Sequence, residues 1–319
     1  MKLSIVVPCF NEEASLRELH RRATRAAQDA VGQDFELVLV NDGSRDQTWQ
    51  LMQTLSGEDP RIAAVNLSRN HGHQLALSAG LSVVRGDRIL ILDADLQDPP
   101  ELLPEMMRLM DEGADVVFGQ RRHRNGETLF KRASATAFYR ILRWLSDVRI
   151  PVDTGDFRLM SRRAVDVLNS MPETHRFIRG MVGWLGFKQV AIEYDRHQRT
   201  AGTTNYPLRR MVRLAIDAIT SFSIKPLRIA SMLGILFALL GMAGVLFSVS
   251  GWLFDRTVPG WTSVMVVVLT LGGIQLTVLG IMGEYLGRLY IESKRRPLYV
   301  IDEIRTQGHA QNASPVKQP

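Results

Sequence analysis

Two uncharged runs constrain the fold of this chain more than any other feature of its 319 residues. They cover residues 229–254 and 257–283, and only Asp255 and Arg256 separate them. At 1.5 Å per residue, each run would form a helix of roughly 40 Å, which exceeds the roughly 30 Å hydrocarbon core of a bilayer. The alternative is a buried helix of a soluble domain, but two such runs in succession favour a transmembrane hairpin.

The basic residues on either side of this hairpin predict its orientation. They are Arg209, Arg210, Arg213, Lys225 and Arg228 before the first run, and Arg288, Lys294, Arg295 and Arg296 after the second. By the positive-inside rule, we expect a multi-pass protein of the inner (cytoplasmic) membrane with both termini in the cytoplasm. The net charge of +6 therefore suits anionic lipid. Nucleic acid is not an expected partner, because the sequence contains no aromatic-rich basic motif.

The residues before the hairpin alternate short apolar runs with helical patterns. Strands are predicted at 3–8, 35–40, 62–67 and 88–93, and helices at 12–31, 46–56 and 72–85. This alternation predicts an α/β domain with a mostly parallel, Rossmann-like sheet and helices on both faces. Residues 153–168 predict a further strand and helix, and 187–206 predict a strand followed by a polar Gly/Thr segment.

Four regions follow from these patterns. Residues 1–205 are expected to form a cytoplasmic α/β domain that contains the predicted sheet. Residues 206–228 place apolar side chains on one helical face, which predicts an amphipathic juxtamembrane helix. Residues 229–286 contain the two transmembrane helices, and residues 287–319 are expected to form a cytoplasmic tail that is disordered from Thr306 onward.

Three of the predicted strands end in polar clusters, namely "PCFNEE", "VNDGS" and "DADLQD". The carboxyl ends of parallel strands meet at one edge of a sheet, and ligands of such sheets bind beyond that edge. We therefore expect all three clusters to open onto one crevice.

The third cluster has the composition of a divalent-metal site. Extended backbone would send Asp93 and Asp95 to the same side, and Gln97 adds an amide oxygen. Mg²⁺ or Mn²⁺ held by few protein oxygens takes its remaining ligands from water and phosphates. The alternative is a solvated turn or a helix cap, because "DPPELL" predicts a helix that begins near Asp98.

The other two clusters also allow two interpretations. Asp42 lies in a favourable turn sequence, yet its place after a buried strand lets it accept hydrogen bonds from a base or ribose. Asn11 and Glu12 either cap the first helix or face a ligand, and both roles can coexist.

Taken together, PCFNEE, NDGS and DADLQDPP resemble the motifs of the GT-A fold of family 2 glycosyltransferases. The stretches NHGHQLALSAGL (70–81), DTGDFRLMSRRAVD (153–166) and GEYLGRLYIESKRRP (283–297) narrow this resemblance to the polyprenyl-phosphate glycosyltransferases. These include the dolichol-phosphate mannose synthases, and the two-span ending is most similar to the bacterial GtrB-type undecaprenyl-phosphate glucosyltransferases. Processive polysaccharide synthases carry a QxxRW signature, whereas RILRW (140–144) lacks the glutamine.

The resemblance implies roles for particular residues on the donor side. Nucleotide-sugar contacts are expected from Pro8, Phe10, Asn11, Glu12, Asp42 and Asp93. Asp95 and Gln97 would be the main ligands of Mg²⁺ or Mn²⁺, beside Asp93. Arg199 opens RTAGTTNY, which corresponds to the family pattern RxxGxSKY that supports the departing diphosphate. Asn205 stands where the family has lysine, so either a neighbouring arginine compensates or that contact is weaker.

On the acceptor side, the resemblance implies that Arg121 and Arg132 bind the lipid phosphate, and the alternative for both is a solvated basic face. Asp156 matches the position proposed as catalytic base in the family. Asp93 and Asp95 are the other two residues that are expected to be catalytic. Asp156 could instead orient Arg158 or the sugar, and Asp153 competes for the same role.

The expected reaction is an inverting, metal-dependent transfer of a hexose from a nucleotide-sugar, with UDP-glucose preferred, to undecaprenyl phosphate. It would take place at the cytoplasmic membrane face and yield a lipid-phosphate sugar for cell-envelope glycan modification. Two spans are too few for a translocation path, so a separate flippase is expected. The sequence also leaves open whether the protein forms a homo-oligomer. The alternatives are another sugar, a hydroxyl acceptor, or a catalytically inactive membrane adaptor.

Overall fold

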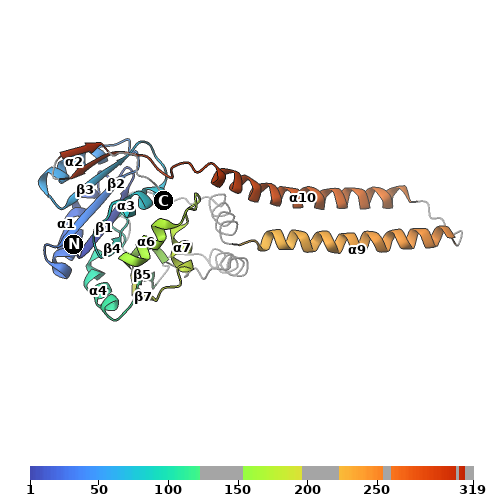
Figure 1. Ribbon diagram of the computed structural model, residues 1–319, viewed down its shortest axis with the longest axis horizontal. Coiled ribbons are helices and arrows are strands. Elements are labelled where there is room, and N and C mark those ends of the chain that lie inside the picture. Colours follow the sequence, from blue (N-terminus) through green and yellow to red (C-terminus); the bar gives the residue numbers. More distant parts are fainter. Residues whose placement is uncertain (123–153, 196–222, 254–259, 307–308, 313–319) are drawn as a thin grey trace. The chain divides into compact units, whose positions relative to one another are not determined.

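The computed structural model describes residues 1–122, 154–195, 223–253, 260–306 and 309–312 (Figure 1). The chain divides into two compact units. The first contains the described residues up to 195 and those from 297 onward, and it is built around a nine-stranded sheet. The second contains two long helices.

The order of the strands across the sheet is β7-β5-β6-β4-β1-β2-β3-β8-β9. The strands are β1 (Leu3–Cys9), β2 (Phe35–Asn41), β3 (Ile62–Leu67), β4 (Arg88–Ile91), β5 (Val116–Arg121), β6 (Thr154–Ser161), β7 (Gln189–Tyr194), β8 (Ile301–Thr306) and β9 (His309–Asn312). The helices of this unit are α1 (Leu16–Val31), α2 (Thr48–Glu58), α3 (His73–Val83), the short 3₁₀ helix η1 (Pro100–Leu102), α4 (Leu103–Asp111), α6 (Arg162–Ser170) and α7 (Ile178–Trp184).

The predicted α/β fold is confirmed. Strands β1 to β4 are mutually parallel where they pair, and β1 lies between β2 and β4. The chain thus builds outward from β1 through β2 and β3, then crosses back to place β4 on the other side of β1. The carboxyl ends of β1 and β4 therefore form a topological switch point, where ligands of such sheets bind.

Helices cover both faces of the sheet, because alternate strand residues point in opposite directions. Leu3, Ile5 and Val7 belong to a buried cluster with residues of α1, α2 and α4. On the other face α3 packs directly on β1 and β2: a Cβ built on Gly80 would lie only 2.4 Å from Val6 Cγ1. Any larger side chain at position 80 would push α3 away from the sheet.

The C-terminal segment departs from the prediction. Part of the expected tail, residues 287–319, instead forms β8, which pairs antiparallel with β3, and β9 pairs with β8. Main-chain pairing explains this addition: Ser68 N donates to the Val300 carbonyl oxygen, and the ladder continues from Leu67–Ile301 to Ala63–Thr306. The polar composition of the tail concealed a strand that completes the edge of the sheet.

The second unit contains α9 (Lys225–Leu253) and α10 (Trp261–Ser293), which lie side by side (Figure 1). The stretches Lys225–Gly244 and Val266–Ser293 are long and apolar enough to cross a membrane. This hairpin matches the predicted pair of helices, with α10 continuing beyond residue 286. Glu284 and Arg288, one turn apart near its end, form an ion pair of 3.0 Å. The helix predicted within 126–145 lies outside the described residues. The amphipathic helix predicted at 206–228 lies mostly outside them, because only residues 223–228 are described.

Candidate active site

The loops that follow β1 and β2 are joined into one rim by hydrogen bonds. Arg45 N donates to Asn11 Oδ1 at 2.8 Å, and Asn11 N donates to Ser44 Oγ at 3.0 Å. Glu12 N donates to Thr48 Oγ1 at 2.9 Å. Asn11 has a positive φ of 57°, a conformation in which asparagine is more readily accommodated than most residues. Asn11 and Glu12 thus connect the loop after β1 with the segment after β2 through hydrogen bonds. Neither is the N-cap residue of α1, which is Ser15.

Pro8 and Phe10 lie on the same rim. Pro8 pairs with Val40, one residue before the end of β1, while Phe10 follows the strand and is 44% exposed. An exposed aromatic ring at the carboxyl end of a central strand offers a flat apolar surface to a ligand. The predicted donor residues of the first cluster therefore meet at one edge.

Asp42 holds the next loop in place. Its side chain is buried, Oδ1 accepts from His71 N at 2.7 Å, and Oδ2 accepts from Gly72 N at 3.0 Å. Burial raises the pKa of Asp42, although these two hydrogen bonds oppose the shift. Gly43 is essential to the arrangement, because its φ is +65° and an added Cβ would lie 2.5 Å from Asn70 N. Both Asp42 oxygens thus have a structural task, and each carboxylate oxygen retains a second lone pair for a ligand.

The segment after β4 differs from its predicted geometry. The strand ends at Ile91, so Asp93 and Asp95 do not lie on extended backbone as expected. Leu96 adopts a φ of +61°, which is unusual for a residue with a branched side chain, and Gln97 N donates to Asp95 Oδ1 at 3.2 Å. A tight turn, rather than strand alternation, brings Asp95 and Gln97 together.

Asp93 follows β4, a strand that lies next to β1 in the middle of the sheet. Its Oδ1 is buried without a hydrogen-bond partner in the described part of the chain, and His73 Nε2 lies 3.5 Å away. Burial, together with the nearby carboxylates of Asp156, Asp98 and Asp95, raises the pKa of Asp93 to about 6, although His73 opposes the shift. A buried carboxylate oxygen without a partner requires a positive neighbour.

A divalent cation fits this donor set. Among the described residues, no group of three or more His, Cys, Asp or Glu side chains surrounds a single point. Mg²⁺, however, is commonly held by one or two carboxylates and by substrate phosphates. Asp93, Asp95 and the Gln97 amide match that requirement. Asp93 Oδ1 accepts no hydrogen bond in the described part of the chain and has only His73 Nε2 nearby, at 3.5 Å, so it is the atom that a cation would satisfy.

Asp156 on β6 is a buried ionic centre. Strand β6 runs antiparallel to β4 with Arg158 opposite Ile91. Asp156 lies near Asp93, because His73 Nε2 is 3.5 Å from Asp93 Oδ1 and 3.2 Å from Asp156 Oδ2. Its carboxylate accepts from Arg179 Nε at 2.9 Å, and His73 Nε2 lies 3.2 Å from Oδ2. Four neighbours therefore surround this carboxylate: His73, Arg179, Gln74 Nε2 at 3.1 Å, and Arg158 Nη2 at 3.7 Å.

These contacts determine the protonation of Asp156. Burial would raise its pKa, but the hydrogen bond with His73 and the charges of Arg179 and Arg158 hold it well below its usual range. Arg158 is itself buried, which lowers its pKa to about 10. The low pKa favours the ionised form of the Asp156 carboxylate, which is surrounded by the donor groups of His73, Gln74, Arg158 and Arg179.

Arg121, a predicted lipid-phosphate residue, lies at the end of β5 opposite Tyr194 of β7. Its Nε donates to the Tyr194 hydroxyl at 3.4 Å, and that hydroxyl donates to Asp98 Oδ1 at 2.5 Å. Asp98 was expected to start the next helix. Instead, it is buried against Tyr194, and the following 3₁₀ helix begins at Pro100 without a side-chain cap.

The remaining predicted residues, Arg132, Arg199 and Asn205, lie outside the described residues, as does Asp153. Sequence reasoning missed Gln74, His73, Arg179 and Tyr194. The first two belong to the polar start of the predicted helix 72–85, in "HGHQ", which was a usable signal. Arg179 and Tyr194 gave none, because they reach the edge only through the packing of α7 and the pairing of β7.

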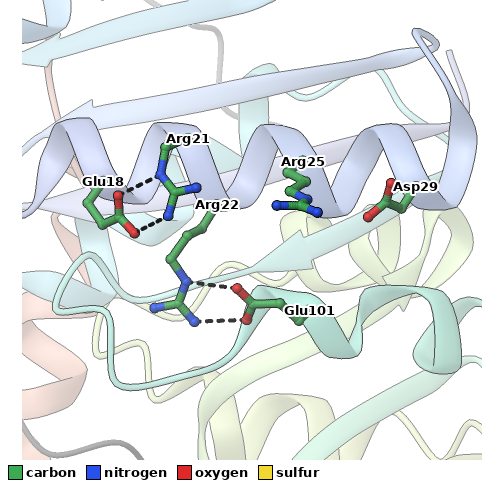
Figure 2. A pocket seen from close by; sticks show the side chains of 6 residues that line it. All are labelled: Glu18, Arg21, Arg22, Arg25, Asp29 and Glu101. Atoms are coloured by element: carbon green, nitrogen blue, oxygen red, sulfur yellow. Dashed lines mark hydrogen bonds and ion pairs between the residues drawn. The ribbon is translucent and has the colours of Figure 1, made fainter.

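A charged hollow lies between α1 and η1, and none of the predicted site residues lines it (Figure 2). It is lined by Glu18, Arg21, Arg22, Arg25, Asp29 and Glu101. Arg21 pairs with Glu18, and Arg22 forms two hydrogen bonds of 2.8 Å with Glu101. Acids and bases are equal in number and come from exposed helical surface, so we interpret the hollow as solvated ion pairs.

The mixed sheet with its parallel central strands, the carboxylates and arginines at its edge, and the apolar hairpin define a membrane-associated α/β protein with a polar candidate site. Its family follows from sequence comparison. The profile of glycosyl transferase family 2 matches residues 4–168, and the profile of the GtrB C-terminal hairpin matches residues 225–289. The chain belongs to glycosyl transferase family 2, and it is a glycosyltransferase with a GT-A fold.

Relatives match over almost the whole chain. YkcC of Bacillus subtilis, an uncharacterized glycosyltransferase, is 45% identical over 95% of this chain and 94% of its own length. The prophage bactoprenol glucosyl transferase homolog of Escherichia coli K12 is 38% identical over 96% of this chain and 100% of its own. The bactoprenol glucosyl transferase of Shigella phage SfV is also 38% identical, over 94% and 98%.

Proposed function

We propose that this glycosyltransferase transfers a hexose, with inversion, from a nucleotide-sugar to a polyprenyl phosphate of the undecaprenyl type. UDP-glucose is the preferred donor. Relatives that bear the name bactoprenol glucosyl transferase, and that match 94–96% of the chain, support this choice of acceptor and sugar. The product would be a lipid-linked phosphosugar that donates its sugar to cell-envelope glycans.

The observation that carries the proposal is the pairing of opposite charges at one edge of the sheet. On one side lies Asp93, whose buried Oδ1 has no hydrogen-bond partner among the described residues. On the other side, Arg158 and Arg179 converge on Asp156, and the Arg121 guanidinium lies across Gly155. A reaction between two phosphate-bearing substrates needs both a cation site and arginines.

The acceptor chemistry explains why the site needs little base catalysis. The second pKa of a phosphate monoester is near 6, so at neutral pH the acceptor is largely a dianion and already a nucleophile. One displacement at the anomeric carbon, without a nucleophile from the enzyme, inverts the configuration. The protein then contributes mainly positioning and charge neutralisation.

Asp156 serves in this scheme as an orienting carboxylate. Its oxygens accept from Gln74 and Arg179 and lie next to His73, and its pKa is well below the usual range. A group with so low a pKa takes up a proton poorly. We therefore assign to Asp156 the orientation of Arg179 and His73 toward the substrates, and not the proposed role of catalytic base.

Asp93, Asp95 and Gln97 would hold Mg²⁺ or Mn²⁺. When bound, the cation supplies positive charge to the diphosphate of the donor. On the same rim, Phe10, Asn11, Glu12 and Asp42 would contact the nucleotide. Pro8 precedes them at the end of β1, while Arg132, Arg199 and Asn205 keep their predicted roles toward the lipid phosphate and the leaving diphosphate.

The hairpin gives the enzyme access to its lipid acceptor. A polyprenyl phosphate stays in the bilayer, so its phosphate must be met at the membrane surface. By the positive-inside rule, the basic residues next to α9 and α10 support a topology in which both termini and the catalytic domain are cytoplasmic. We further propose that a separate flippase moves the product, and that the protein can form a homo-oligomer.

A donor panel tests the proposal. Membranes that contain the protein are incubated with undecaprenyl phosphate and radiolabelled UDP-glucose, UDP-galactose, UDP-N-acetylglucosamine or GDP-mannose. We expect label from UDP-glucose in a lipid fraction that mild acid hydrolyses, as a phosphosugar requires. An acid-stable polymer or glycolipid would support a hydroxyl acceptor, and no transfer from any donor would support an inactive adaptor.

A further inference from the structure

Tyr194 is a buried residue that the proposed reaction does not yet use. Its ring packs edge-on against Phe157, with 5.7 Å between ring centroids, and an added Cβ on Gly119 would lie 2.7 Å from its Cε1. Only 4% of the residue is exposed. The ring is therefore held firmly, and the position of its hydroxyl is determined by the surrounding core.

The Tyr194 hydroxyl connects two parts of the site. It donates to Asp98 Oδ1 at 2.5 Å and accepts from Arg121 Nε at 3.4 Å. Asp98 is 1% exposed and directly follows Gln97, so it belongs to the loop that carries the metal-ligand candidates. Tyr194 thus links the donor-side loop to an arginine on the acceptor side.

Gly155 limits the position of the Arg121 guanidinium on the side away from Tyr194. A Cβ built on Gly155 would lie 3.0 Å from Arg121 Nη2, so the guanidinium passes closely over a residue that has no side chain. Gly155 directly precedes Asp156. The guanidinium is consequently held between a hydroxyl that accepts from its Nε and a backbone surface that lies under its Nη2.

We propose that Tyr194 is a positioning residue for the acceptor phosphate. Its hydroxyl, fixed by buried Asp98, directs the Arg121 guanidinium across Gly155 toward the phosphate of the lipid. This inference rests on the proposed function, because the role of Arg121 toward the lipid phosphate is part of that proposal. It predicts that Tyr194 affects acceptor binding without touching either substrate.

The test is a KM comparison in Tyr194→Phe, which keeps the ring and removes the hydroxyl. Rates are measured with undecaprenyl phosphate varied at saturating UDP-glucose, and then with the donor varied. We expect the KM for undecaprenyl phosphate to rise about 5- to 10-fold, the effect of one lost hydrogen bond, while the donor KM and kcat stay within about twofold. Tyr299→Phe, a matched change in the same unit, should alter neither KM.

Gly155→Ala provides a second route that leaves Asp98 and Tyr194 intact. Its Cβ should displace the Arg121 guanidinium and raise the KM for undecaprenyl phosphate in the same way. This variant decides the question if Tyr194→Phe folds poorly because Asp98 has lost a donor, which a fall in melting temperature would reveal.

Arg121→Ala separates the two proposals. If the KM for undecaprenyl phosphate rises in Arg121→Ala, and Tyr194→Phe adds nothing in that background, the positioning role is supported. If it rises in Arg121→Ala but stays at the wild-type value in both Tyr194→Phe and Gly155→Ala, the positioning role is refuted and the proposed function stands. If Arg121→Ala leaves this KM unchanged, the assignment of Arg121 is wrong and the positioning role falls with it.

Discussion

Replacing Asp156 by asparagine should show whether this carboxylate orients neighbouring groups or acts as a catalytic base. The change keeps the size of the side chain and removes its charge. Arg158, which is 4% exposed, would then lie buried beside a neutral amide, and Arg179 would lose its ionic partner. Breaking a buried ion pair by removing one partner costs about 3–5 kcal/mol of folding free energy.

This cost predicts a large change in thermal stability. For a domain of about 200 residues, each kcal/mol shifts the melting temperature by about 2–4 °C, so Asp156→Asn should lower it by roughly 6–20 °C. Intrinsic fluorescence of the detergent-solubilised protein measures this fall, and the radiolabelled transfer assay measures turnover. Both should decrease together, because the same contacts hold the fold and orient Arg179.

Asp166→Asn is the matched control. Asp166 pairs with Arg162 at 3.7 Å on the surface of α6, and its side chain is 60% exposed. Exposed pairs of this kind contribute about 0–1 kcal/mol, so the melting temperature should change little. The melting temperature falls whichever role Asp156 has, so the pH dependence of turnover separates the two roles. A base role predicts a loss of turnover of about 10²- to 10⁴-fold that shrinks as the pH rises above the second phosphate pKa of the acceptor, near 6, whereas the loss of an orienting group persists at all pH values. A loss that shrinks in this way would refute the orienting role.

Three further predictions concern the metal site, the pH dependence of stability and a loop contact. Asp95→Ala should abolish transfer at any Mg²⁺ or Mn²⁺ concentration while the protein melts normally, and wild-type turnover would contradict the metal assignment. Burial alone would raise the pKa of Asp59, yet hydrogen bonds from Arg61 and His20 lower it to about 2. The ionised Asp59 therefore contributes at most about 2 kcal/mol to the free energy of unfolding above pH 4. This contribution is lost as the pH falls from about 4 to 2, so Asp59→Asn should flatten the dependence of stability on pH in that range. Gly43→Ala should lower the free energy of unfolding by more than about 1 kcal/mol, because the φ of Gly43 is +65° and the new Cβ would collide with Asn70 N. An unchanged melting temperature would contradict this account.

The sequence alone predicted the architecture and the edge of the sheet at which the candidate site lies. Apolar runs at 3–8, 35–40, 62–67 and 88–93 correspond to β1 to β4, because a buried parallel strand must be apolar on both faces. The polar residues that follow these runs meet at one edge for a purely topological reason: parallel strands end on the same side. The two uncharged runs likewise predicted the hairpin by length alone.

The chemistry of individual carboxylates was decided only by tertiary structure. Asp42, Asp98 and Asp156 look alike in the sequence, yet one holds a loop, one accepts from Tyr194 and one joins two arginines. Apart from Arg158, which lies two residues from Asp156, these partners lie 23 to 96 residues away along the chain, so local pattern could not reveal them. Strand β8 was missed for the same reason, because its stability comes from pairing with the edge of β3 and not from its own polar sequence. Residue type and spacing are local properties, whereas burial, charge partners and strand pairing exist only once distant segments have come together.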